Sequence, residues 1–203
     1  MSEGSNGKNA LAEAKRTAMI DIAIELIADG GLGGLTFRKL AARAGTSTAP
    51  FTTEFGSREA MLEDVVKVVW RRLGVRPGEL EAEEPLATLR DVLRRATPVE
   101  EPVNPLLKAW LELYVEAIDN APLKKALREV EAEGYPSYIG LIERCQAAGE
   151  ISKAHDPEDL LSALWALGDG LLLGYLLHPD FFTGERTNRI WEQGFGALVT
   201  DPA

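Results

Sequence analysis

Basic and hydroxyl side chains are concentrated in one short stretch near the N-terminus, where their types and spacing suit contacts with phosphate groups. Arg38, Lys39 and Arg43 would share the outward side of a two-turn helix that is capped by Thr36 and ended by Gly45. The hydroxyl-rich segment after this glycine would open a second short helix. Two such helices joined by a tight turn form a helix-turn-helix, whose second helix enters the major groove of DNA. The stretch therefore favours DNA binding, with a merely solvated basic face as the alternative interpretation.

The distribution of charge divides the chain into two parts. The net charge is −10, which by itself argues against a nucleic-acid partner because Lys and Arg supply most non-specific affinity for DNA. The first 75 residues, however, hold ten basic and nine acidic side chains, whereas the remaining 128 hold 12 basic and 23 acidic ones. This asymmetry suggests two roles, although a solvated acidic surface explains much of the second part.

Helical periodicity dominates the whole sequence, and no stretch alternates apolar and polar residues for long enough to predict a strand. We therefore predict an all-α fold of about nine helices. Pro136 should kink or split the longest of them, because proline removes a backbone donor and clashes with the preceding turn. Ser47 and Ser57 are expected to cap the third and fourth helices. The expected helices cover residues 11–29, 37–44, 48–54, a segment from 57 onward, 86–97, 103–119, 122–148, 157–177 and 185–199.

Composition predicts three segments. Residues 1–9 are rich in Gly, Ser and Asn and are expected to be a disordered tail. Residues 10–75 form the helix-turn-helix domain, and residues 76–203 form a helical C-terminal domain. The boundary is placed in the sequence GVRPGELEAEEP, which combines two prolines, two glycines and an acidic run.

The stretch from Arg16 to Leu62 resembles the DNA-binding domain of the TetR family of transcriptional regulators. The matching run is AIELIADGGLGGLTFRKLAARAGTS, followed by FGSREAML. It contains the family's alanine-rich first helix, its glycine before a capping Thr, its basic second helix, its Ala-Gly-x-Ser turn and its Phe-x-Ser-Lys/Arg-Glu-x-Leu opening of helix four. The resemblance implies an N-terminal three-helix helix-turn-helix unit followed by a C-terminal helical domain that binds a ligand and dimerises.

The resemblance also implies which residues contact a double-stranded DNA operator. Thr36 and Arg58 would bind phosphates, and Arg38 a base or a phosphate. The full expected set is Thr36, Arg38, Lys39, Thr46, Ser47, Thr48, Ala49, Thr52, Thr53 and Arg58. The chain departs from the family in its recognition helix, where Pro50 lacks an N–H and Thr52 replaces the usual tyrosine. Glu54 adds a negative charge there, so this helix should read DNA in an altered manner or with lower affinity.

The run LLSALWALGDGLLLGYLL, residues 160–177, is apolar enough to raise the question of a membrane span. Asp169 would lie at the bilayer centre and no positive cluster flanks the run, so we expect a buried helix and no membrane partner. The family resemblance implies a homodimer joined by this helix and the last one from each subunit. Two recognition helices about one DNA turn apart would then read a pseudo-palindrome. The expected interface residues are Leu164, Leu171, Gly174, Trp191 and Phe195.

Aromatic residues of the C-terminal part could line a cavity for a small-molecule effector. A core position is the usual alternative for any one of them. The expected ligand-binding residues are Trp110, Tyr114, Tyr138, Trp165 and Asp169, the last as a polar anchor. Ligand binding would then release the protein from DNA, because it would favour a spacing of the two recognition helices that no longer fits the operator.

Catalysis finds little support in the sequence. His155 and His178 lack metal-ligand spacing, Cys145 has no evident base nearby, and no glycine-rich phosphate loop follows a strand. We therefore expect no enzyme activity, no cofactor and no metal. A single cysteine and the polar start MSEGSNGKNA favour the cytoplasm. The alternative function is a ligand-binding or interaction module of the same fold with weakened DNA binding.

Overall fold

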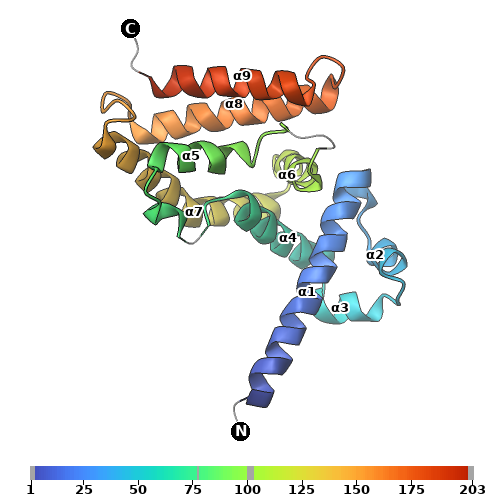
Figure 1. The fold of residues 1–203 in the computed structure, drawn as a ribbon. Helices are drawn as coiled ribbons and strands as arrows, with labels where there is room; N and C mark the ends of the chain where they lie inside the picture. Colours follow the sequence, from blue (N-terminus) through green and yellow to red (C-terminus); the bar gives the residue numbers. More distant parts are fainter. Residues whose placement is uncertain (1–2, 77, 100–102, 201–203) are drawn as a thin grey trace. The chain divides into compact units, whose positions relative to one another are not determined.

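The computed structural model describes residues 3–76, 78–99 and 103–200, which contain nine α-helices, two short 3₁₀ helices and no strand (Figure 1). An all-α fold is thereby confirmed. The α-helices are α1 (Glu3–Gly30), α2 (Phe37–Ala44), α3 (Ala49–Phe55), α4 (Arg58–Leu73), α5 (Pro85–Arg94), α6 (Pro105–Glu116), α7 (Ala121–Ala148), α8 (Pro157–Leu177) and α9 (Gly184–Val199). The 3₁₀ helices are η1 (Leu32–Gly34) and η2 (Glu79–Glu81).

Most predicted helices match the observed ones to within three residues at each end. The prediction for the N-terminal tail was wrong over residues 3–9, because α1 already begins at Glu3; residues 1–2 lie outside the described residues. The following segment, KNALAEAKR, consists largely of good helix formers, so the helix extends toward the N-terminus beyond its buried part. Helix α7 is not split, since it continues through Pro136 as one element.

The chain divides into two compact units, each of which has its own buried side chains. The first unit comprises residues 1–69 and 108–128, and the second comprises residues 70–107 and 129–203. These units do not coincide with the division predicted after residue 75, because most of α6 and the start of α7 belong with the N-terminal helices. The predicted domain boundary after residue 75 therefore stays a prediction.

In the first unit, α1 and α4 each bury an apolar stripe. The buried residues at helical spacing are Ile20, Ala23, Ile24 and Ile27 of α1 and Met61, Leu62, Val65, Val66 and Val69 of α4. Leu40 of α2 and Phe51 and Phe55 of α3 are buried in the same unit. Both short helices thus use one side for packing, and their other sides face solvent.

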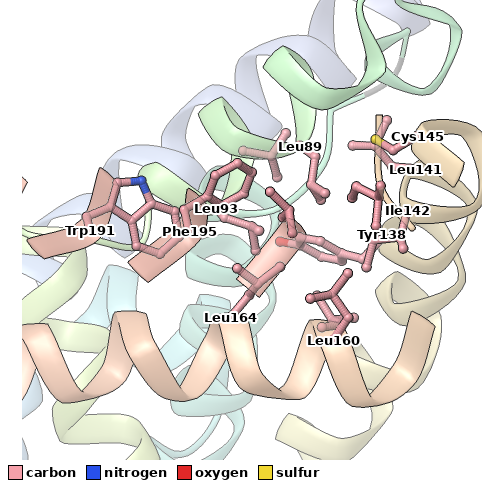
Figure 2. Packing of buried hydrophobic residues seen from close by; sticks show 14 of the residues in the cluster. Leu89, Leu93, Tyr138, Leu141, Ile142, Cys145, Leu160, Leu164, Trp191 and Phe195 are labelled. Carbon is pink, nitrogen blue, oxygen red and sulfur yellow. The ribbon is translucent and has the colours of Figure 1, made fainter. Parts of the chain in front are cut away.

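The second unit is built around one hydrophobic cluster to which four helices contribute (Figure 2). Leu89 and Leu93 come from α5, Leu164 from α8, and Trp191 and Phe195 from α9. Tyr138, Leu141, Ile142 and Cys145 add one face of α7. Two of the residues predicted to bind a ligand belong to this region, Tyr138 in the cluster and Trp165 packed against it.

Helix α8 is long and apolar enough to cross a membrane by length and composition, the only such helix in the described residues. Asp156 begins it by accepting hydrogen bonds from the N–H groups of Glu158 and Asp159 at 2.9 and 3.0 Å. One side of α8 packs into the second unit's core, and α9 lies alongside it (Figure 1). The approach is close at Gly194, where a Cβ atom would lie 2.6 Å from Leu167. The apolar character of α8 is thus partly explained by its packing against other helices of the same chain.

Candidate nucleic-acid interface

The start and end of α2 are fixed by the two residues that the sequence predicted. The Thr36 hydroxyl oxygen accepts a hydrogen bond from the Lys39 N–H at 3.2 Å, which satisfies one of the helix's free donors. Gly45 then adopts a left-handed conformation with φ of 65°. The N–H groups of Gly45 and Thr46 donate to carbonyls of the last turn, as in a Schellman motif. A side chain at position 45 would be strained, so the glycine sets the angle between α2 and α3.

Helix α3 begins one residue later than predicted. Its N-cap is Thr48 rather than Ser47, and no side-chain hydrogen bond caps it. Pro50 lies in the first turn, where its missing N–H would have had no partner within the helix. Thr52 turns its hydroxyl back to the Thr48 carbonyl at 3.2 Å. The exposed side of α3 therefore carries small methyl and hydroxyl groups and no basic side chain.

Nine of the ten residues predicted to contact DNA are exposed. They occupy one continuous part of the chain, the N-cap and outer side of α2, the turn and the outer side of α3 (Figure 1). These nine are Thr36, Arg38, Lys39, Thr46, Ser47, Thr48, Ala49, Thr52 and Thr53. Thr36 uses its oxygen as an acceptor for the cap, which leaves its hydroxyl proton available to a phosphate oxygen. Their roles toward DNA stay predictions.

Arg58, the tenth predicted residue, is half-buried and has a structural task. Its Nε donates to the Leu35 carbonyl at 3.0 Å, and its Nη2 donates to the Leu32 carbonyl at 2.6 Å. Both carbonyls belong to the segment that connects α1 with α2. A guanidinium has five donors, so a phosphate contact remains compatible with this geometry. Sequence reasoning missed the structural role, because nothing in the local pattern indicates which carbonyls Arg58 will reach.

Two other charged residues of the region, Arg43 and Glu54, form ion pairs that their positions in the sequence did not indicate. Arg43, on the basic side of α2, forms ion pairs with Glu25 and Asp29 of α1 at 3.2 and 2.7 Å. Glu54 pairs with Arg16 of α1, whose guanidinium also bonds Asp64. The hydrogen bond to Glu54 raises the pKa of Arg16 above its ordinary value. The charge of Glu54 is thus compensated within the unit rather than left facing a phosphate.

The residues predicted to bind a ligand fall into two groups. Trp110 and Tyr114 lie on α6 in the first unit, with ring centroids 5.5 Å apart. Tyr138 and Trp165 lie in the second unit, where their centroids are 5.5 Å apart in an edge-to-face arrangement. Asp169 is exposed, although desolvation by the surrounding protein raises the pKa of its carboxyl group.

Trp70 and Tyr135 extend the pair in the second unit to a four-ring cluster, which we call the aromatic cluster. Both rings lie edge-on to Trp165, with centroid distances of 5.9 and 5.4 Å. Gly134 allows the Trp70 ring to approach α7, since a Cβ at that position would lie 2.6 Å from the indole nitrogen. Trp70 was not among the residues predicted to bind a ligand, although it lies one helical turn beyond Val66, which is buried.

The residues predicted for the dimer interface stay a prediction, and most of them are buried within their own chain. Leu164, Leu171, Trp191 and Phe195 are all buried in the core of their own chain, which leaves them little surface for a partner. Gly174 is also used within the chain, because a Cβ there would lie 2.9 Å from the Phe182 ring. The pattern had identified an apolar helix but could not tell its inward side from its outward side. The exposed side of α8 carries Ala166, Asp169, Gly170, Leu173 and Leu177.

The one cysteine of the sequence is inaccessible to solvent. Cys145 is fully buried in the second unit's core, and desolvation raises the pKa of its thiol to about 12. Such a thiol stays protonated and is a poor nucleophile. Within the described ranges, no group of three or more His, Cys, Asp or Glu side chains is arranged to hold a metal ion.

Comparison with known proteins gives two family matches that together span most of the chain. Residues 19–65 match the N-terminal model of bacterial regulatory proteins of the tetR family. Residues 85–199, more than half of the chain, match the C-terminal domain of BetI-type transcriptional repressors. The first match covers the helices α2 and α3 with their flanking packing partners.

Individual relatives agree with these matches. The HTH-type transcriptional regulator BetI of Paraburkholderia phytofirmans is 29% identical over 187 residues, covering 90% of this chain and 92% of the relative. The BetI regulator of Burkholderia thailandensis is 28% identical over 172 residues, covering 82% and 84%.

Two solved structures show the same fold. A TetR transcription regulator from Haloarcula marismortui superimposes with a TM-score of 0.71 at 18% identity, covering 93% of this chain and all of the other. A transcriptional regulator from Saccharomonospora viridis, solved in complex with choline, gives a TM-score of 0.73 at 20% identity and covers 92% and 96%.

Proposed function

Because this chain belongs to the TetR family of transcriptional regulators and has a BetI-type C-terminal domain, we propose that it represses transcription as an operator-bound homodimer released by a small molecule. The family consists of DNA-binding regulators, not enzymes. A regulator of this kind acts on the chromosome, in the cytoplasm. The operator is a pseudo-palindrome with one half-site for each subunit.

One observation carries the DNA-binding part of the proposal. The outer sides of α2 and α3 hold nine exposed residues with donors or small methyl groups, while the inner sides of the same helices are buried. Arg38 and Lys39 supply the positive charge, and α3 supplies hydroxyl groups. Small hydroxyl and methyl groups distinguish bases less sharply than a bidentate Arg or Asn, so much of the specificity comes from thymine methyl groups and DNA shape.

The homodimer part rests on the exposed side of α8. Leu173 and Leu177 are 47% and 63% exposed, although they lie in the most apolar helix of the chain. Gly170 lies one turn before Leu173, and a Cβ atom there would meet nothing within 4 Å in this chain. Small residues at such a position let a second helix approach closely, and burial of the leucines would favour association.

The ligand-response part rests on the family and on the fold. A solved neighbour binds choline, and at 20% identity that likeness supports a ligand-binding fold without identifying the ligand of this chain. The effector acts by binding more tightly to the conformation that fits the operator poorly.

The test combines DNA binding with oligomeric state. The full chain should retard a DNA fragment from upstream of its own gene in a salt-dependent manner and sediment as a dimer. Leu173→Glu should yield monomers that bind the fragment far more weakly, because a carboxylate would be buried against its symmetry mate. Leu11→Glu, an exposed leucine on α1, is the matched control and should stay dimeric. A dimeric Leu173→Glu variant with full affinity would overturn the proposed interface.

The altered recognition helix favours a second candidate, a ligand-binding regulator of the same fold with weak DNA binding. Helix α3 has no basic residue, and Thr52 bonds its own helix backbone. In this case the chain would dimerise and bind its effector, but it would not discriminate the upstream fragment from unrelated DNA of the same length. The same retardation assay with a competitor duplex separates the two candidates.

A further inference from the structure

Arg16 of α1 connects three helices of the first unit through its side chain. Its Nη1 donates a hydrogen bond to Glu54 of α3, and its Nη2 donates one to Asp64 of α4. Every other side chain between residues 11 and 18 is exposed, whereas Arg16 is half-buried. These two bonds therefore join the middle of α1 both to α4 and to α3, the proposed recognition helix.

Helix α3 depends on such contacts for its orientation, because it is short and weakly capped. It has seven residues, and no side-chain hydrogen bond caps its start. A helix of two turns is not stable by itself in water, so packing must hold it. Phe51 and Phe55 supply that packing by burial, but apolar burial is non-directional.

The contact with Arg16 adds the direction that apolar burial lacks. A hydrogen bond between a guanidinium and a carboxylate has a defined geometry, and the one to Glu54 lies in the last turn of α3. The same guanidinium lies over the Phe55 ring, with 5.1 Å between its Cζ and the ring centroid. One side chain of α1 thus holds two neighbouring residues at the end of α3.

A second arginine of the unit, Arg43, shows what distinguishes Arg16. Arg43 also pairs with two carboxylates, Glu25 and Asp29, but both belong to α1 and neither to α3. Those two carboxylate side chains are 53% and 65% exposed, whereas the two partners of Arg16 are 33% and 23% exposed. Ion pairs between exposed side chains contribute little, because water and salt screen them. The network of Arg16 should therefore hold its helices more firmly than that of Arg43.

We propose that Arg16 is a positioning residue for operator recognition, which fixes the orientation of α3 by joining Glu54 to α1 and to Asp64 of α4. The inference rests on the proposed DNA-binding function and names a residue that determines its specificity. Arg16 acts through α3 and does not bind a phosphate, because its charge is already shared by two carboxylates. Base readout requires side chains placed at the base edges, whereas attraction to phosphates is independent of sequence. Loss of the network should thus reduce discrimination between sequences more than it reduces affinity for DNA in general.

The first test measures discrimination between two duplexes. Fluorescence anisotropy gives the Kd of the full chain for the fragment from upstream of its gene and for an unrelated duplex of the same length. Arg16→Gln should lower the ratio of the two affinities by about tenfold or more, because a neutral amide cannot replace the charge-assisted bonds to both carboxylates. A partly unfolded variant would lose affinity for both duplexes by the same factor, so this ratio separates positioning from a general loss of stability.

Further variants locate the effect at the contact between Arg16 and Glu54. Glu54→Gln should also lower the ratio, and the double variant should lower it no further than Arg16→Gln alone, because both changes remove one contact. Arg16→Lys should recover part of the ratio, since an ammonium keeps the charge but lacks the fork that reaches both carboxylates. Arg43→Gln is the matched control and should keep the parent ratio. Additive losses, or an equal loss in the control, would overturn the proposal.

The salt dependence shows whether Arg16 contacts a phosphate instead. Each phosphate contact contributes about 0.9 to the slope of log K against log salt concentration, so loss of one per subunit would make a dimer's slope shallower by about 1.8. The double variant Arg16→Gln/Glu54→Gln leaves the summed charge of the pair unchanged, and its slope should equal that of the parent. A slope shallower by about 1.8 would overturn the positioning role.

Hydrogen exchange measures the anchoring of α3 without DNA. In the full chain, Arg16→Gln should speed amide exchange in α3 by about tenfold, while α2 keeps its parent rate because Thr36 and Gly45 fix its ends. An unchanged rate in α3 would overturn the proposal even if DNA binding were lost. If the parent chain preferred neither duplex while exchange in α3 still rose in the variant, the proposed repressor function would fail and the anchoring of α3 by Arg16 would stand.

Discussion

The replacement Arg38→Ala tests the DNA interface most directly. Arg38 is exposed on α2, and no hydrogen bond or ion pair holds its side chain among the described residues. Each phosphate neutralised by a basic residue contributes about 0.9 to the slope of log K against log salt concentration. A dimer carries two copies, so the variant's slope should be shallower by about 1.8. Between roughly 50 and 200 mM salt, this change reduces the loss of affinity by about tenfold.

Fluorescence anisotropy with a labelled fragment from upstream of the gene, repeated over a series of KCl concentrations, measures this slope. Arg43→Ala is the matched control, because Arg43 is an exposed arginine of the same helix whose guanidinium is paired with Glu25 and Asp29 of α1. Its removal should leave the slope nearly unchanged. The reasoning is refuted if Arg38→Ala keeps the parent slope, or if both variants change it equally.

Three other predictions concern stability. Arg58→Ala should lower the free energy of unfolding by about 2 kcal/mol in urea titrations, because two backbone carbonyls lose a charged donor; an unchanged midpoint would contradict this. Desolvation raises the pKa of Asp169, so the folded chain holds this proton more tightly than the unfolded chain and is less stable once the pH exceeds the raised pKa. Asp169→Asn should therefore raise the Tm at pH 7, and the gain should vanish at pH values below 3.8, the ordinary pKa. Gly140→Ala should stabilise α7 by about 0.5–1 kcal/mol in thermal unfolding, whereas Gly134→Ala should not, since its Cβ would meet the Trp70 ring at 2.6 Å; equal gains would argue against that close contact.

The sequence by itself determined the helices and the helix-turn-helix. Thr36 and Gly45 fix the limits of α2 through hydrogen bonds and backbone conformation that are local to a few residues. Helix α8 covers the predicted residues 157–177, and the side chain of Asp156 caps its start. Elements of this kind depend on propensity, capping and apolar spacing, all of which can be read along the chain.

Only the tertiary structure decided which side of each helix is used and which partners charged side chains find. It placed Leu164 and Trp191 in the core of their own chain. It also brought Arg58 within hydrogen-bonding distance of two carbonyls that lie more than twenty residues away in the sequence. It likewise brought two segments to one cavity, the end of α4 and the residues after it with Arg72 and Arg76, and the end of α5 with Arg94 and Arg95. An apolar helix without a polar side presents no periodic signal for its inward direction. Long side chains likewise choose partners by distance in space, which the order of residues does not encode.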